Sequence, residues 1–179
     1  MMTMSPDPRR HRHPSNGTLR RVRVDYITEE SVYGTVLVSG MIVATGGHGS
    51  SSIQVFVTVI STVAVFWAAH VYAGTIAGHG LDEGGRSGLA SSFRAALRRS
   101  LGFLTSALPQ SAVLLLGALH TIDDTAALWA ALWLGVAILA VLGFTVFALR
   151  GDSWPIRIIG AVTTALFGVA MIVLKAVIH

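Results

Sequence analysis

The chain contains five long runs of hydrophobic residues separated by short polar segments. A helix needs about 20 predominantly apolar residues to cross a bilayer, and each run reaches or approaches that length. The pattern therefore predicts an all-α integral membrane bundle of five transmembrane helices, formed by residues 26–179. The predicted spans cover residues 28–47, 52–77, 101–119, 125–149 and 155–178.

Two polar segments interrupt this pattern. Residues 1–25 are rich in arginine and proline and cannot bury enough apolar surface to order themselves, so we predict a disordered basic tail. Residues 88–100 predict a short amphipathic helix before the third span. Its leucine and phenylalanine side chains recur every four residues, and arginines lie opposite them. Such a helix suits the surface of the anionic cytoplasmic leaflet of the lipid bilayer.

Arginine and lysine residues are distributed unevenly between the two predicted sides of the membrane. Cytoplasmic segments carry an excess of these residues, and this excess sets the orientation of a membrane protein. All twelve arginines fall in the tail, in residues 78–100 or in residues 150–157, which share one side. The turns at 47–51 and 120–125 hold none, and Lys175 is close enough to the other end to reach outward. We predict a cytoplasmic N-terminus and an external C-terminus.

Composition supports the assignment to integral membrane proteins and argues against a nucleic-acid partner. Hydrophobic residues make up 53% of the chain and charged residues 12%, against about a quarter charged in a typical soluble domain. The net charge of +4 is explained by the placement of the arginines, so we predict no nucleic-acid partner. Cysteine is absent from the sequence, which removes thiolate metal sites and thiol catalysis. A multi-pass protein with its basic tail inside fits a bacterial plasma membrane.

His70 is the one ionisable side chain predicted to lie well inside a span. The second span places it on the cytoplasmic side of the midpoint, and the antiparallel first span brings Tyr33 and Glu30 to a similar depth. A histidine there can gate or relay protons, because imidazole changes charge near neutral pH. It can equally be a neutral imidazole that bonds Tyr33 or a backbone carbonyl and fixes helix packing. The carboxylates all lie in loops or at helix starts, which argues against a transporter driven by a buried carboxylate.

The third span carries a polar segment close to its centre. Pro109 removes a helix hydrogen bond, and Gln110 and Ser111 follow it directly. Ser106 and Gln110 are four residues apart and share one face, which makes them the best candidates for a conduit lining. The alternative is a structural role, with Gln110 bonded across a helix interface.

Other chemistry is weakly supported. His48, His120, Asp123 and Asp124 gather at the external side, but their spacing matches no metal motif, and both aspartates are expected at a helix start. The histidines are also badly placed for bis-histidine haem ligation. We therefore predict no metal, no cofactor and no enzymatic activity.

Two patterns concern assembly. A 72-residue offset relates His48 to His120 and Ser39 to Ser111, which raises the hypothesis of a duplicated hairpin. Gly40 and Ala44 form a small-residue step that allows close approach of another helix. The leading functional prediction is a homo-oligomeric channel or transporter-like protein. The alternative is a non-catalytic accessory subunit that binds another membrane protein.

Overall fold

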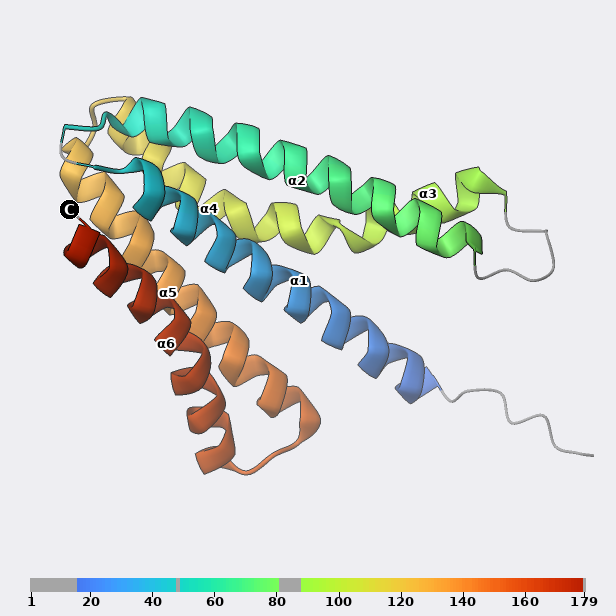
Figure 1. The fold of residues 1–179 in the computed structure, drawn as a ribbon. Helices are drawn as coiled ribbons and strands as arrows, with labels where there is room; N and C mark the ends of the chain where they lie inside the picture. The colour runs from blue at the N-terminus through green and yellow to red at the C-terminus, as the bar shows by residue number, and fades with distance from the viewer. Residues whose placement is uncertain (1–15, 48, 81–87, 179) are drawn as a thin grey trace, which may run out of the picture.

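The computed structural model describes residues 16–47, 49–80 and 88–178, and every regular element within these ranges is an α-helix. Figure 1 shows the helices as two splayed groups that converge at one end of the molecule. The helices are α1 (Asn16–Thr45), α2 (Ser52–Gly80), α3 (Leu89–Arg99), α4 (Leu101–Ala118), α5 (Asp124–Arg150) and α6 (Trp154–Ile178).

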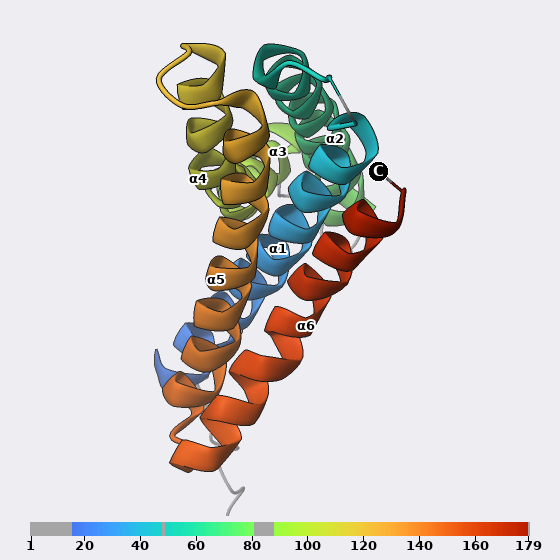
Figure 2. The same cartoon turned by 90° about the vertical axis from the view of Figure 1, so that its left-hand side faces the viewer.

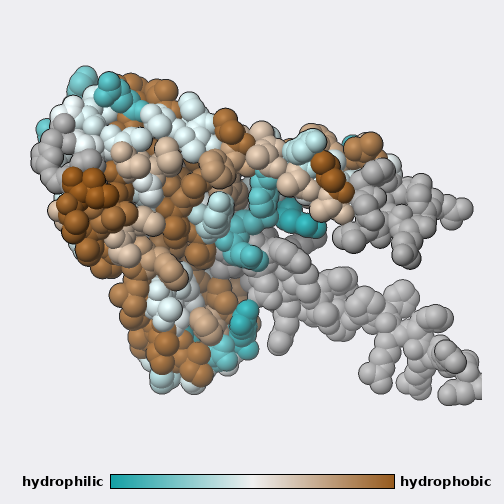
Figure 3. All heavy atoms as spheres, in the orientation of Figure 1, coloured by the Kyte–Doolittle hydropathy of each residue, from teal (hydrophilic) through white to brown (hydrophobic). Residues whose placement is uncertain are grey.

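Within the part of the chain that the structure describes, four helical segments are long and apolar enough to cross a membrane: Ser52–Gly78, Leu89–Ala118, Asp124–Arg150 and Trp154–Ile178. These segments confirm the prediction of an all-helical fold that is compatible with a membrane. Figure 3 shows hydrophobic residues over much of the outer face of α5 and α6. The first predicted span, residues 28–47, is not among the four. It begins with Glu29 and Glu30, and small polar residues follow at intervals, which lowers its apolar character.

The start of α1 differs from the prediction. The helix begins at Asn16, so residues 16–25 are helical although we assigned them to a disordered tail. Arginine is a good helix former, the last proline of the tail is Pro14, and the one glycine of residues 16–28, Gly17, lies in the first turn of the helix. Residues 1–15 of the predicted tail lie outside the described residues.

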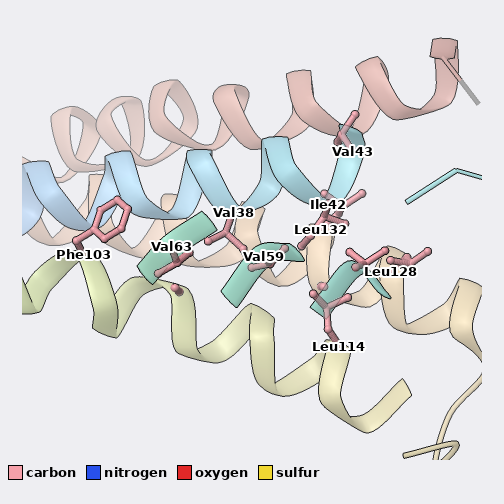
Figure 4. Packing of buried hydrophobic residues seen from close by; sticks show 12 residues of the cluster. Val38, Ile42, Val43, Val59, Val63, Phe103, Leu114, Leu128 and Leu132 are labelled. Carbon is pink, nitrogen blue, oxygen red and sulfur yellow. The ribbon is translucent and has the colours of Figure 1, made fainter. Parts of the chain in front are cut away.

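Helix α1 is the central element. In Figure 2 it passes between α2 and α6, with α5 beside it. Val38, Ile42 and Val43 of α1 are buried, and Figure 4 shows Val59 of α2 and Leu132 of α5 packed around them. Lipid tails are as apolar as leucine, so in a membrane such contacts stabilise the fold through close packing rather than through the hydrophobic effect.

The molecule has two chemically distinct ends. At the first, called here the hairpin end, α1 leads into α2 and α4 leads into α5, and α6 finishes there (Figure 1). At the second, called the arginine end, α2 leads toward α3 and α5 turns into α6. Described arginines of the arginine end include Arg99, Arg150 and Arg157.

Helix-end residues fix both ends of α5, and the acidic start of this helix was predicted from the sequence. The side chain of Asp123 accepts hydrogen bonds from the backbone of Thr125 and Ala126 and so caps the start of α5. Gly151 ends α5 in the left-handed region, with φ of 81°, where an L side chain would be strained. Close packing of α5 on α6 follows from Gly143 and Gly160, where an added Cβ would collide with the facing helix.

Helix α3 forms where the amphipathic pattern predicts it but packs through a different face. Ser92 and Ala96 of α3 are buried, and they face Gly74 and Gly78 near the end of α2. Ser100 keeps a helical conformation (φ −75°, ψ −3°), and its N–H donates to the carbonyl of Ala96 at 2.9 Å, so α3 continues into α4. The predicted apolar stripe remains largely uncovered by this chain, with Leu89, Phe93 and Leu101 exposed.

Helices α1 and α4 run in the same direction and keep a nearly constant sequence offset. The hydroxyl of Ser31 donates to the carbonyl of Gly102, and Ser39 accepts from Gln110, each across 71 residues. Ser52 contacts Asp124 across 72 residues. The α1–α4 contacts thus differ by one residue from the 72-residue offset noticed in the sequence, and the duplicated hairpin stays a hypothesis.

Candidate functional site

Buried polar side chains line the contact between α1 and α4, and we call them the polar seam. On α1 they recur every four residues, a spacing that places them on one face of the helix. On α4 they face this row from two positions, also four residues apart. The seam consists of Ser31, Thr35, Ser39, Ser106 and Gln110, all buried. The sequence analysis identified the α4 half of this seam but not the α1 half.

Gln110 lies at the hairpin-end side of the seam, opposite Ser39, and has no exposed surface. Its side-chain nitrogen donates to the hydroxyl of Ser39 on α1 at 2.9 Å and to the backbone carbonyl of Ala131 on α5 at 3.1 Å. One amide group thus joins three helices. This is the interhelical bonding that the structural alternative predicted for Gln110.

Glycines make room for the polar seam. A Cβ on Gly135 of α5 would lie 2.6 Å from Nε2 of Gln110 and 2.7 Å from Oγ of Ser39. A Cβ on Gly34 of α1 would collide with the hydroxyl of Ser106. The hydroxyl of Ser106 donates to the carbonyl of Phe103, one turn earlier in α4. The close approach of these helices is therefore specific to the positions that hold the polar groups.

Two acceptors at the centre of the bundle lack partners. The side-chain oxygen of Gln110 and the hydroxyl of the buried Ser111 have no hydrogen-bond partner. Helix α4 continues through Pro109, which is half-buried beside them. Buried polar groups in proteins are nearly always bonded, and exceptions commonly mark functional sites or bound water.

His70 and Glu30 meet at the arginine-end side of the seam. Nε2 of His70 lies 3.5 Å from Oε1 of Glu30, and the side chains are 49% and 10% exposed. The prediction that these residues lie at one depth on neighbouring helices is confirmed. The second carboxylate oxygen of Glu30 is buried and unpartnered. Tyr33, the other predicted neighbour, is half exposed, and its ring lies tilted by 34° against that of Phe103 with ring centroids 6.1 Å apart.

The external metal candidates do not converge among the residues that the structure describes. No group of three or more His, Asp and Glu side chains suited to a metal occurs there. Asp123 caps α5, and Asp124 accepts the backbone N–H of Ser52 at the start of α2. His120 is exposed in the α4–α5 turn with a positive φ of 55°. His48 lies outside the described residues.

A cavity at the hairpin end was not predicted from the sequence. Its volume is about 250 Å³, and Lys175, Asp124 and Trp129 are among the side chains that line it. The ammonium of Lys175 donates to the carbonyl of Gly46 at 2.6 Å and lies 5.7 Å from the centre of the Trp129 ring. The signal available in the sequence was a lysine in an otherwise apolar helix. We expected its side chain to reach outward, but only 5% of it is exposed.

Taken together, fold and site define an all-helical protein with four helices suited to crossing a membrane and a buried polar seam within the helix bundle. In comparisons with known proteins, the chain matches no protein-family model, no curated protein and no solved structure.

Proposed function

We propose that the protein is a five-span plasma-membrane protein that moves a small polar solute or ion as a homo-oligomer. The fifth span is α1, whose apolar residues are packed among the other spans while its polar face joins the seam. The arginine end lies in the cytoplasm, in line with the excess of arginine on cytoplasmic segments. Oligomerisation is part of the proposal because five helices rarely enclose a wide aqueous path alone.

The observation that carries the proposal is the pair of unpartnered acceptors beside Pro109. The side-chain oxygens of Gln110 and Ser111 are buried near the middle of α4 without a hydrogen-bond partner. An unpaired polar group in an apolar interior costs about 1–3 kcal/mol. In the proposed path, a passing solute or a chain of water molecules supplies the missing hydrogen-bond donors and so offsets this cost.

His70 and Glu30 extend this arrangement toward the arginine end. They are the ionisable pair nearest the polar seam, and His70 is half exposed while Glu30 is almost buried. Histidine side chains commonly serve as proton shuttles and pH sensors in proteins, and this one lies between a buried carboxylate and the surface. We propose this pair as the cytoplasmic gate of the path.

The test is flux of ions and protons into liposomes that contain the purified protein, at about pH 5.5 and about pH 7.5. We expect Gln110→Leu to abolish flux and His70→Ala to remove its pH dependence. The matched control is Gln54→Leu, which changes the other glutamine of the chain at an exposed position of α2. Unchanged flux in a folded Gln110→Leu protein would end the conduit assignment.

A second function, an accessory subunit of another membrane protein, is favoured by one observation. A Cβ on Gly40 would meet nothing within 4 Å, and Ala44 one turn later is exposed. The small-residue step of α1 is therefore open to a helix from outside this chain. This function predicts no flux and a second polypeptide that co-purifies with the wild type but not with Gly40→Leu. Loss of self-association in the same variant supports the homo-oligomer instead.

A further inference from the structure

The cavity at the hairpin end holds two opposite charges that do not neutralise each other. Lys175 of α6 and Asp124 of α5 both line it. Among the described residues, no ion pair joins them. Each side chain is instead held by a backbone group of another segment: Lys175 by the carbonyl of Gly46, directly after α1, and Asp124 by the N–H of Ser52 in α2. The positive charge of Lys175 and the negative charge of Asp124 are thus held apart within one cavity.

Lys175 retains binding capacity. An ammonium has three donors, and the bond to Gly46 uses one of them. Its charge is buried, and burial of an ammonium is costly unless other groups compensate it. The carbonyl end of α1 and the face of Trp129 compensate part of this charge. An anionic group in the cavity would supply the remainder.

A simple anion is not the best ligand, because Asp124 repels it. The carboxylate of Asp124 takes the N–H of Ser52 on one oxygen, at 3.1 Å, and a carboxylate has further acceptor sites. A ligand that carries an ammonium as well as an anionic group can pair with both Asp124 and Lys175. The cavity volume of about 250 Å³ is smaller than the roughly 300–1,000 Å³ of sites for drug-sized ligands, which limits the ligand to a small molecule or head group.

We infer that this cavity binds a small zwitterion, with its anionic group on Lys175, its primary ammonium on Asp124 and its body against Trp129. The same chemistry occurs in the smallest amino acids and in the ethanolamine head group of a phospholipid. The proposed orientation places the cavity at the external side of the membrane. The inference is independent of the proposed flux, because it needs only the geometry of the hairpin end.

The experiment is calorimetric titration of the whole protein in phosphatidylcholine nanodiscs with glycine, acetate and methylammonium. We expect glycine to bind at least about tenfold more tightly than either singly charged probe, because glycine makes both charged contacts and each probe makes only one. Lys175→Met should lose glycine binding, and Arg94→Gln, an exposed change on α3, should keep it. Circular dichroism establishes that each variant is folded.

Asp124→Asn tests the site through a gain of acetate binding, which an unfolded variant cannot show. Asparagine keeps an oxygen for the N–H of Ser52 but removes the negative charge, so acetate should bind more tightly than it does to the wild type, while glycine binds more weakly. Acetate binding as tightly as glycine to the wild type would overturn the inference.

A second arm distinguishes the source of the zwitterion. Native mass spectrometry of protein from nanodiscs containing phosphatidylethanolamine should show retained lipid that is lost in Lys175→Met, if the head group is the ligand. Binding of glycine in phosphatidylcholine identifies a free solute instead. Either result supports the site, and the absence of both overturns it.

Discussion

The backbone N–H of Ser52 donates to the carboxylate of Asp124 at 3.1 Å, across 72 residues of sequence. This bond ties the first residue of α2 to the first residue of α5. The first N–H groups of a helix have no partner within it, so Asp124 acts as a capping residue supplied from another helix. Ser52 completes the contact through its hydroxyl, which donates to the carbonyl of Asp124 at 3.4 Å.

The first prediction concerns this contact. Asp124→Ala leaves the start of α2 without its acceptor and should lower the free energy of unfolding by about 0.5–2 kcal/mol, the usual range for a lost cap. Asp124→Asn should retain most of the stability, because its amide oxygen still accepts. Thermal unfolding in detergent measures both. Equal melting temperatures for wild type and Asp124→Ala would show that the contact contributes nothing.

The second prediction compares two Gly→Ala substitutions. Gly135→Ala places a methyl group 2.6 Å from Nε2 of Gln110, so the seam must shift, and overpacking of this kind costs about 1–3 kcal/mol. Gly40→Ala meets nothing within 4 Å and should be neutral or stabilising by up to about 1 kcal/mol, since alanine favours a helix over glycine. Urea or thermal unfolding of both variants checks the difference. A Gly135→Ala protein as stable as Gly40→Ala would contradict the packing of the seam.

Much of the secondary structure followed from local sequence. Apolar runs gave the four membrane-compatible helices, and Asp123 caps the start of α5, where acidic residues were expected. These features depend only on neighbouring residues. The start of α1 was wrong because low hydrophobicity was taken to mean disorder, although it does not prevent a helix from continuing.

Side-chain partners were harder to predict, because depth in a span does not determine the rotation of a helix. Glu30 and His70 were expected at one depth and do meet. Gln110 stood out as polar, but its partners, Ser39 and Ala131, depend on how three helices turn toward each other. Lys175 was expected to reach outward and instead bonds Gly46, since a carbonyl at the end of α1 lies within reach.

The third prediction concerns the α2–α3 contact. Ala96 is buried and lies 3.2 Å from the position of a Cβ on Gly74, whereas the neighbouring Ala95 is exposed. Ala96→Leu should separate α3 from α2 and increase cleavage by trypsin after Arg94 and Arg98. Ala95→Leu adds the same side chain to the exposed face and should leave the rate unchanged. Equal cleavage of both variants would show that Ser92 and Ala96 do not form the packed face.

The last prediction concerns the coupling between Glu30 and His70. A double-mutant cycle of Glu30→Gln and His70→Ala should give a coupling free energy of about 0.5–3 kcal/mol, the range for residues in contact, because Nε2 of His70 lies 3.5 Å from Oε1 of Glu30. Glu30→Gln alone should be close to neutral or stabilising, since it removes a charge whose second oxygen is buried without a partner.

Unfolding in detergent measures stability, and liposome flux measures function on the same variants. A gating role requires that His70→Ala change the pH dependence of flux by more than its effect on stability explains. If the variant changes stability and flux in proportion, the pair serves only to pack α1 against α2.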